Sequence, residues 1–443
     1  MLNACDSLGI LVLDEVRSSG STKNSLNQIE WMVKNHRNHP SVFLWSMANE
    51  EGGTQRNIVG KKYMKKMVYL THQLDPSRLV TAGVNAWGSS VDFGFSEEID
   101  VMGFNYSLDF IDDYHKNHPD QPLIGTETSN ASVTRGVYLR ETTGNNNVLT
   151  DGVGGYYNSD GILIKLKKMP RHIAANNPNK YKHVFKTQKF YAERKFLAGR
   201  FIWTGFDYNG ETWGGTFPSS SSQFGAIDLA GFPKDAFYYY KSWWTNIPVL
   251  HIAQHWNWEG NENKSVDVLI FSNADEIILY RNHKKLGVKK MPEYGYVKWK
   301  VKYKPGELRA VGINNGKRIS EEIIKTAGNP SRMELIPNKS VLDLKDNGIA
   351  AINVNITDKK GVLVPLANNL IRFEIKGDAK ILGVGNGDPA TAESDTADFR
   401  KAFNGKAMLI IQIANSEDKI ELMARSEGLK SSSVTIKNPA TKK

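Results

Sequence analysis

The segment NHPSVFLWSMANEEGG, residues 38–53, combines an apolar strand pattern with an acidic end. Val42–Met47 is a run of bulky apolar residues, and Asn49, Glu50, Glu51 and two glycines close the segment. A continuous apolar run, rather than an alternating one, is typical of a strand in a sheet that is covered on both faces. The pattern predicts a rigid buried strand that presents a carboxylate over a pocket.

Similar apolar segments alternate with helical patterns as far as about Trp244. The predicted strands are Ile10–Asp14, Val42–Met47, Leu79–Val84, Val101–Tyr106, Pro122–Thr126 and Phe201–Phe206. Between them, apolar residues recur at three- and four-residue spacing, which is the period of an amphipathic helix. This alternation predicts parallel strands joined by crossover helices, arranged as an open sheet or as a (β/α) barrel.

After Pro248 the pattern changes to short strands separated by turns. Glu276–Arg281 and Tyr296–Tyr303 are two of these strands, and a second break follows at Gly328-Asn329-Pro330. We predict an α/β domain at residues 1–247, an open sheet or a TIM barrel, and two antiparallel β-sandwiches of the immunoglobulin type at residues 248–328 and 329–443.

Composition narrows the classes of protein to which the chain can belong. The 443 residues are 40% hydrophobic and 23% charged, as in a globular protein of two or three domains. The formal net charge is +10, but the basic residues are scattered, so we expect no nucleic-acid partner. No apolar run is long enough to span a bilayer. Cys5 is the single cysteine, which excludes an internal disulfide framework and a cysteine-based metal site.

The first residues, MLNACDSLGILVLDE, lack the pattern of a signal peptide. They read as the end of a helix, a stop at Gly9, and then a buried strand. We therefore expect the chain to begin inside a fold. A periplasmic or secreted location would suit a longer parent protein, but the sequence does not fix the compartment.

Polar side chains gather where the predicted strands end. The strand ends carry Asp14-Glu15, Asn49-Glu50-Glu51, Asn85, Asn105-Tyr106, Glu127 and Asp207. In an α/β barrel the catalytic groups lie at this carboxyl face. One polar strand end is ordinary, because turns are polar. Carboxylates at several strand ends, together with amide and aromatic side chains, indicate a site.

Glu50 and Glu127 form the best candidate pair of carboxylates. Two carboxylates that face each other suit glycosidic bond cleavage, in which one protonates the leaving oxygen and the other attacks the anomeric carbon or activates a water. Taken alone, each is as well explained as an acid that caps a loop or helix. Glu51 is the alternative to Glu50, since a side-chain period of two lets only one of them point into the pocket.

Aromatic residues support a sugar as the ligand. Trp203 lies in the last predicted strand, and Trp213 and Phe217 lie in the loop after it. Flat rings stack on the apolar face of a pyranose. For Trp243 and Trp244, on a predicted terminal helix, core packing is the better interpretation.

Several motifs resemble glycoside hydrolase family 2, the β-galactosidase-like retaining enzymes. NHPSVFLWSMANEE, PLIGTETS, GRFIWTGFDYNGE and FGAIDLAGFPKDAFYYYKSWW occur in the order expected for the family, within residues 1–248. DEIILYRNHKKLG is similar to the β-sandwich that follows the barrel in these enzymes, and ILGVGNGDP is similar to their last immunoglobulin-like domain.

The resemblance implies a role for each matching residue. Glu50 would be the general acid and base, and Asn49 would hydrogen-bond the sugar 2-hydroxyl. Glu127 would be the nucleophile, and Tyr106 would hydrogen-bond it and help to keep it ionised. The remaining substrate-binding candidates are Trp203, Asp207 and Asn85.

The chain also departs from the family pattern. Six barrel strands are predicted where a closed barrel needs eight, and the β-sandwiches that precede the barrel in family members are missing. We therefore expect an N-terminally truncated fragment. The chemistry belongs to the parent enzyme, and the activity of this chain alone stays open.

Three functions remain in competition. The first is a retaining exo-β-galactosidase that acts on an oligosaccharide or polysaccharide with a terminal β-linked sugar. The second is another specificity within the family, β-glucuronidase or β-mannosidase. The third is a catalytically inactive fragment that binds carbohydrate. No cofactor is expected, no ligand cluster supports a divalent or sodium ion, and a homo-oligomer is compatible with the sequence.

Overall fold

The computed structural model describes residues 1–130, 133–138, 148–149, 155–157, 163–165, 178–211, 220–342, 348–413 and 419–437. These form two compact units, which are described separately. The first comprises Met1–Asn130 and Val184–Trp203, and the second Ala131–His183 and Thr204–Lys443. The predicted domain limits at residues 247 and 328 stay predictions.

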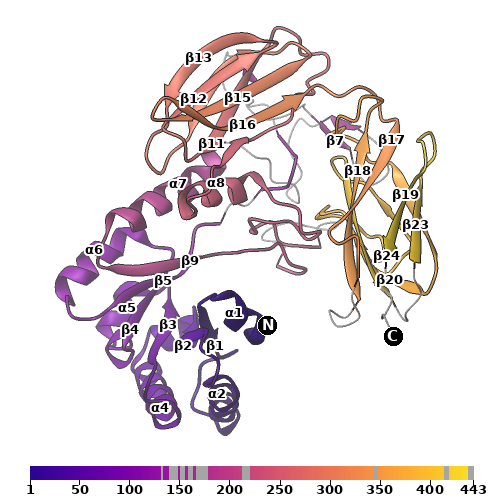
Figure 1. Cartoon of the computed structure of the whole chain (residues 1–443). Helices are drawn as coiled ribbons and strands as arrows, with labels where there is room; N and C mark the ends of the chain where they lie inside the picture. Colours follow the sequence, from indigo (N-terminus) through magenta and orange to yellow (C-terminus); the bar gives the residue numbers. More distant parts are fainter. Residues whose placement is uncertain are drawn as a thin grey trace. The chain divides into compact units, whose positions relative to one another are not determined.

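The first unit is built on one parallel sheet whose strands follow the order of the sequence (Figure 1). Its strands are β1 (Val12–Glu15), β2 (Val42–Asn49), β3 (Leu79–Val84), β4 (Val101–Asn105), β5 (Leu123–Thr128) and β9 (Leu197–Ile202). Every neighbouring pair is parallel. The sheet therefore needs a crossover between each pair of strands.

Helices supply these crossovers. They are α2 (Lys23–His36), α3 (Gly52–Gln55), α4 (Ile58–Leu74), α5 (Trp87–Asp92), the 3-10 helix η1 (Ser96–Glu98), α6 (Leu108–Asn117) and α7 (Pro178–Glu193). Helix α1 (Leu2–Leu8) precedes β1. The two longest helices after β1 and β2 begin at side-chain caps, Thr22 for α2 and Asn57 for α4, whose oxygens accept backbone N–H groups of the first turn.

The two faces of the sheet have different cores. The larger core joins strand residues such as Trp45 and Met102 to helix residues such as Met32, Met67 and Ile111. A smaller cluster of Leu44, Val101 and Ile124 comes from strands alone. Sequential strand order, with helices against one face and a strand-only core on the other, is the arrangement of a partial (β/α)8 barrel and not of a doubly wound sheet.

The second unit contains two β-sandwiches. The first packs β10 (Leu250–Ile252), β11 (Ser265–Ser272) and β14 (Val297–Lys302) against β12 (Glu276–Arg281), β13 (Lys284–Lys290), β15 (Glu307–Asn314) and β16 (Lys317–Lys325). Its core contains residues of both sheets, including Val268, Leu279 and Leu308, together with Trp258 from the segment between β10 and β11. Helix α8 (Asp235–Trp244) and the short strands β6 (Val148–Leu149), β7 (Gly155–Tyr157) and β8 (Leu163–Lys165) also belong to this unit.

The second sandwich has two four-stranded antiparallel sheets. One contains β17 (Arg332–Pro337), β18 (Ile349–Thr357), β20 (Ala379–Gly385) and β22 (Lys406–Ile413), and the other β19 (Leu370–Lys376), β21 (Phe399–Lys401), β23 (Lys419–Arg425) and β24 (Ser432–Lys437). Strands such as β18 alternate between buried and less buried residues, as expected for a sheet with one face in a core. The predicted fold class, a partial barrel followed by β-sandwiches, is confirmed.

Two details of the sequence interpretation are wrong. The last barrel strand spans Leu197–Ile202 rather than Phe201–Phe206, so Trp203 follows the strand instead of lying within it. Trp244 is 51% exposed and stacks on Tyr240 rather than packing into a core. No helix in the described parts of the chain is both long and apolar enough to cross a membrane.

Candidate active site

The carboxyl ends of β2, β4 and β5 share a local irregularity. Each pairing slips in register there, between Ser46 and Asn49, between Phe104 and Asn105, and between Gly125 and Thr128. Such bulges bend a strand and redirect its side chains. They lie directly beside the predicted site residues, so the regular sheet ends where the site begins.

Two of these residues have a left-handed backbone. Glu50 has φ 60° and Tyr106 has φ 62°, a conformation that is uncommon for residues other than glycine. Each is held by a hydrogen bond to the next strand, from Glu50 N–H to the Gly83 carbonyl at 3.0 Å and from Tyr106 N–H to the Glu127 carbonyl at 2.7 Å. Strain of this kind persists only where the surroundings fix it, and it is common at functional sites.

A buried amide fixes the orientation of Glu50. Asn105, which is fully buried, donates from Nδ2 to Glu50 Oε1 at 2.9 Å and to Asn49 Oδ1 at 3.0 Å. Its own Oδ1 accepts from Thr126 Oγ1 at 2.6 Å. A carboxylate can only accept while the threonine hydroxyl can donate, so this orientation of the amide satisfies both of its ends.

Glycine at position 83 makes room for these amides. A Cβ atom there would lie 2.8 Å from Asn49 Oδ1 and 3.1 Å from Asn105 Oδ1, closer than side chains normally approach. A buried glycine inside a strand often marks a close approach of another group. Here it allows the ends of β2 and β4 to meet over β3.

Glu127 is half-buried and accepts a hydrogen bond from Tyr106 OH at 3.0 Å. The pKa of Glu127 is raised to about 7, mainly by burial and to a smaller degree by the charge of Glu50, and the hydrogen bond from Tyr106 opposes this rise. The effect of the Glu50 charge on the pKa of Glu127 means that the two carboxylates are close enough to interact electrostatically. A carboxylate pair with a perturbed pKa in a polar strand-end cluster is a typical functional site.

Glu51, the alternative to Glu50, is occupied by backbone groups. Its Oε2 accepts from Asn49 N–H at 2.8 Å and its Oε1 from Ser19 N–H at 3.2 Å. One carboxylate oxygen therefore holds the end of β2, and the other holds the segment between β1 and α2. This arrangement favours Glu50 as the group that is available for chemistry.

Asn85 follows β3 and has a different setting. Its backbone N–H donates to Gln55 Oε1 at 3.1 Å, and Gln55 also donates to the Gly83 carbonyl. Among the described residues, no hydrogen-bond partner meets the buried side-chain Oδ1 of Asn85. No hydrogen bond connects it to the carboxylates, so its substrate-binding role stays a prediction.

Trp203 is half-buried after β9, whereas Asp207 belongs to the second unit. Asp207 Oδ1 accepts from Lys234 Nζ at 2.6 Å and from Gly225 N–H at 2.8 Å. Burial raises the pKa of Asp207 to about 6 although Lys234 lowers it. The lysine side chain is fully buried, so the ion pair fixes the loop around it. Contact of either residue with a sugar stays a prediction.

The remaining aromatic candidates cannot be placed. Trp213 and Phe217 lie outside the described residues. Across the parts of the chain that are described, no group of three or more His, Cys, Asp or Glu side chains could hold a metal ion.

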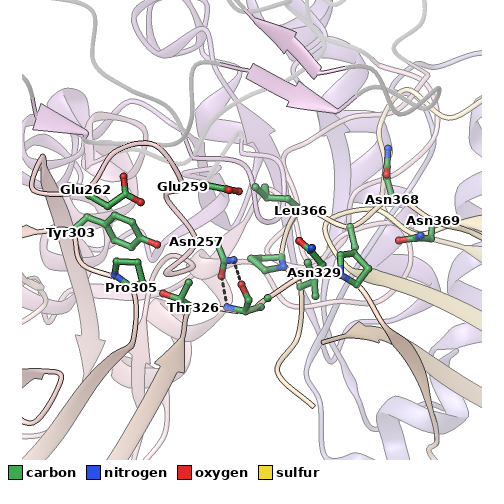
Figure 2. A pocket seen from close by; sticks show the side chains of 16 residues that line it. Asn257, Glu259, Glu262, Tyr303, Pro305, Thr326, Asn329, Leu366, Asn368 and Asn369 are labelled. Carbon is green, nitrogen blue, oxygen red and sulfur yellow. Dashed lines mark hydrogen bonds between the residues drawn. The ribbon is translucent and has the colours of Figure 1, made fainter. Parts of the chain in front are cut away.

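A pocket of about 600 Å³ lies at the junction of the two sandwiches and contains none of the predicted site residues. Figure 2 shows Asn257 at this junction, where its side chain exchanges two hydrogen bonds with the Ala327 backbone. The pocket is lined by amides and by Glu259 and Glu262, without an exposed aromatic ring. It therefore does not compete with the carboxylate pair as a candidate for glycosidic chemistry.

Comparison with known proteins decides the family. Residues 17–144 match the TIM barrel domain of glycosyl hydrolases family 2, and residues 333–435 match the family 2 C-terminal domain 5. Residues 263–320 match a domain of unknown function, DUF4982. The chain belongs to glycoside hydrolase family 2.

Relatives differ in their named activities. The Bacteroides ovatus beta-galactosidase BoGH2A is 33% identical, over 98% of this chain and 55% of that protein. A beta-glucuronidase of Formosa agariphila is 25% identical, over 92% of this chain and 38% of that protein. The crystal structure of a family 2 member from Bacteroides cellulosilyticus superposes with a TM-score of 0.80 at 26% identity, covering 99% of this chain and 56% of that one. The chain thus spans about half the length of these family 2 relatives.

Thr126, Gln55 and Gly83 were not predicted as site residues, and Asn105 was predicted only as a polar residue at a strand end, without a role. For Thr126 the available signal was that it directly precedes Glu127. The contacts of these residues depend on the bulges and left-handed residues at the strand ends, which a pattern of apolar residues does not encode.

Proposed function

We propose that the protein is a retaining exo-glycosidase that removes terminal non-reducing β-D-galactose residues. The observation that carries the proposal is the paired arrangement of Glu50 and Glu127, each held by its own hydrogen-bond donor at the end of a barrel strand. If the mechanism is retaining, the two carboxyl groups are expected about 5–5.5 Å apart with substrate bound.

The two carboxylates take different roles in this proposal. Ionised Glu127 attacks the anomeric carbon, while Glu50 gives its proton to the glycosidic oxygen, which leaves as an alcohol. Glu50 then takes a proton from a water molecule, whose oxygen displaces Glu127 from the anomeric carbon. Two inversions at that carbon return the β configuration.

The hydrogen bonds support this division of labour. Asn105 donates to Glu50 Oε1, so a protonated Glu50 carries its hydrogen on Oε2, which is left to face the leaving group. Asn105 also occupies Asn49 Oδ1, and the Asn49 side chain hydrogen-bonds Glu127, so one of the two Asn49 N–H donors is left for a sugar hydroxyl. Tyr106 donates to Glu127 and favours its ionised form.

Galactose as the sugar is supported by the 33% identical relative, which is named a beta-galactosidase. A glucuronide would need a cation or amide for its carboxylate, and the eight residues directly after Glu127, Thr128–Arg135, contain no Asn-Lys pair. The first such pair after Glu127, Asn179-Lys180, lies 52 residues further along the chain. β-Glucuronides and β-mannosides are therefore the substrates to compare with β-galactosides in every assay.

Azide rescue of two alanine variants tests the roles. With 2,4-dinitrophenyl β-galactoside, azide added to Glu127→Ala should restore turnover and give the α-galactosyl azide, because azide replaces the nucleophile. Azide added to Glu50→Ala should give the β-galactosyl azide, because azide attacks the glycosyl-enzyme. If the two products are exchanged between the variants, the two roles are reversed. If the unsubstituted chain turns over the substrate but azide rescues neither variant, Glu50 and Glu127 are not the catalytic pair.

A further inference from the structure

We propose that the second compact unit binds a neutral oligosaccharide in a groove that contains none of the carboxylate-pair residues. The groove has a volume of about 760 Å³ and lies between residues 206–231 and residues 382–410. This volume falls within the range of small-molecule sites. The inference goes beyond the proposed glycosidase activity, because binding here needs no catalysis.

The apolar part of the groove includes an exposed aromatic ring. Phe206 is 59% exposed, and Leu229 and Leu382 beside the same groove are 39% and 37% exposed. Aromatic rings offer flat apolar contact area at small entropic cost, which suits the apolar face of a sugar ring. Exposed apolar side chains that gather in a concave surface often mark a ligand-binding site.

Strand β20 leaves space for a ligand next to its backbone. Gly383 and Gly385 line the groove, so no side chain covers the main chain at these two positions. A Cβ atom on either would be in ordinary contact, 3.4 Å from Asp395 O or Ala230 Cβ. Glycine at such positions allows a close approach to the backbone.

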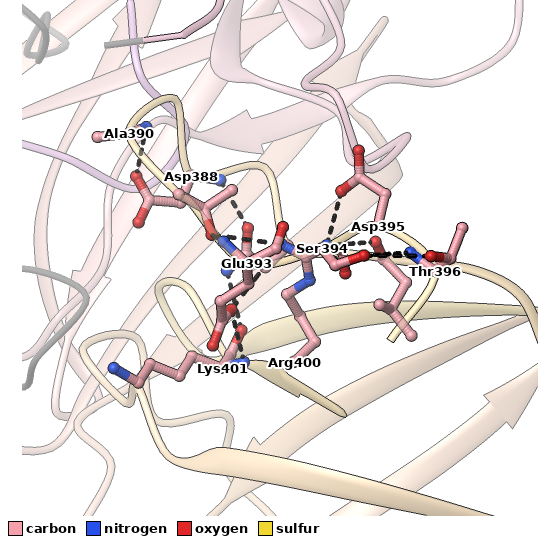
Figure 3. Close-up of polar contacts among 11 residues, drawn as sticks. Asp388, Ala390, Glu393, Ser394, Asp395, Thr396, Arg400 and Lys401 are labelled. Carbon is pink, nitrogen blue, oxygen red and sulfur yellow. Dashed lines mark hydrogen bonds and ion pairs between the residues drawn. The ribbon is translucent and has the colours of Figure 1, made fainter. Parts of the chain in front are cut away.

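A buried arginine holds an exposed carboxylate at the groove. Arg400 is fully buried, whereas the side chain of Asp395 is 74% exposed, and Arg400 Nη2 lies 2.6 Å from Asp395 Oδ1. The same guanidinium donates to the carbonyls of Val384 at 2.8 Å and Ser394 at 3.2 Å. Figure 3 shows Arg400 beside Ser394 and Asp395. Among the described residues the Arg400 Nε atom is buried without a partner. The arrangement pre-orients a carboxylate that remains open to solvent, which lowers the ordering cost of binding.

The charge of the lining selects the class of sugar. Asp388, Glu393 and Asp395 line the groove, and Arg400 is the single cation among the described lining residues. The guanidinium is already engaged by Asp395 and by backbone carbonyls. Carboxylates accept hydrogen bonds from hydroxyl groups, but they repel uronates and sulfates. The groove therefore fits a neutral glycan.

Binding to the full chain that carries Glu127→Gln, which prevents turnover, tests this inference. The probes are β-1,4-galactotetraose in calorimetry and β-1,4-galactan, galactomannan and polygalacturonate in affinity gels. A saturating concentration of isopropyl β-D-thiogalactoside occupies the candidate active site. We expect binding of neutral glycans to survive this competitor, and polygalacturonate to bind more weakly.

Two variants separate binding from a purely structural role of the loop. Phe206→Ala removes the stacking face, and Asp395→Asn keeps an acceptor for Arg400 but removes the charge. Each should weaken binding about tenfold or more, which corresponds to about 1.4 kcal/mol, without lowering the melting temperature. Tyr69→Ala, on α4 and 66% exposed, is the control that should leave binding unchanged.

Three results would overturn the inference: no binding of any neutral glycan, displacement by the thiogalactoside, or equal binding by Phe206→Ala, Asp395→Asn and the parent. Tighter binding of polygalacturonate would reject the neutral class. If a chain with Glu127 intact binds glycans in the groove but hydrolyses no galactoside, the proposed enzyme activity is rejected. The inference that the groove binds a glycan is then unaffected.

Discussion

Replacing Glu127 by glutamine is expected to stabilise the protein, and to do so only at neutral and alkaline pH. The pKa of this carboxyl is raised from 4.5 to about 7, mainly by burial and then by the charge of Glu50. Between these two pH values the folded state holds a proton that the unfolded state has lost, so the parent protein loses stability as the pH rises. Glutamine does not titrate and still accepts the hydrogen bond from Tyr106.

The size of the effect follows from the shift in pKa. A shift of this size corresponds to at most ~3 kcal/mol at pH 8, and partial solvent access reduces the expected gain to roughly half of that. Near pH 4.5 both proteins are neutral at this position and should be equally stable. For a unit of this size the gain at pH 8 is a few degrees in Tm, roughly 3–6 °C.

The assay compares the urea midpoint and Tm of the variant and the parent at half-unit steps from pH 4.5 to pH 8.5. The difference between them isolates Glu127 and its coupling to Glu50, because groups that do not interact with Glu127 titrate alike in both proteins. Asp75→Asn is the control of opposite sign. Burial alone would raise the pKa of Asp75, but hydrogen bonds from Ser77 and Arg78 outweigh it and lower the pKa to about 2. This variant should lose stability above pH 4, where the parent carboxylate is ionised and paired.

A difference for Glu127→Gln that is flat across this pH range would refute the reasoning. Destabilisation that grows with pH would be a stronger contradiction, because it would mean that the folded state favours the ionised carboxylate. The expected gain also carries a functional cost, since a glutamine at this position cannot act as the proposed nucleophile.

Three further outcomes are expected. Tyr106→Phe removes the hydrogen bond that lowers the pKa of Glu127, so the acidic limb of the kcat/KM profile for a galactoside should move to higher pH, and an unmoved limb would contradict the contact. Asn105→Ala should lower kcat by roughly 10- to 100-fold for a poor leaving group but little for 2,4-dinitrophenol, because it misplaces the Glu50 proton; equal losses would indicate general damage. Burial lowers the pKa of His255 to about 4, so stability should fall by up to ~3 kcal/mol as the pH drops from 6.5 to 4, and His255→Gln should abolish this fall in a calorimetric pH series.

The sequence predicted most of the barrel strands because their interior position leaves a strong apolar pattern. Leu79–Val84 was predicted with the observed limits, and five of its six residues are buried. The strand at Leu197–Ile202 was misplaced for a physical reason. It lies at the edge of the sheet, its residues are only partly buried, and Gly199 has φ 148°, so it lacks the signature of a buried strand.

The candidate site was only partly predictable. Glu50, Asn49, Tyr106 and Glu127 follow from the rule that catalytic groups lie at the carboxyl ends of barrel strands. The role of Asn105 depends on which way the strand end turns, and the bulges decide this. Asp207 illustrates the converse, because its partner Lys234 is 27 residues away and no local pattern indicates a buried ion pair.

Trapping of a covalent intermediate tests the central claim most directly. The chain is incubated with 2,4-dinitrophenyl 2-deoxy-2-fluoro-β-D-galactoside, and its intact mass and peptide map are measured beside the glucuronic acid and mannose analogues. The fluorine slows breakdown of the glycosyl-enzyme by destabilising the transition state. A single galactosyl label on Glu127, absent from Glu127→Gln, is the result that the proposed mechanism predicts. A label on Glu50 or another carboxylate, or no label in a folded chain, would contradict it.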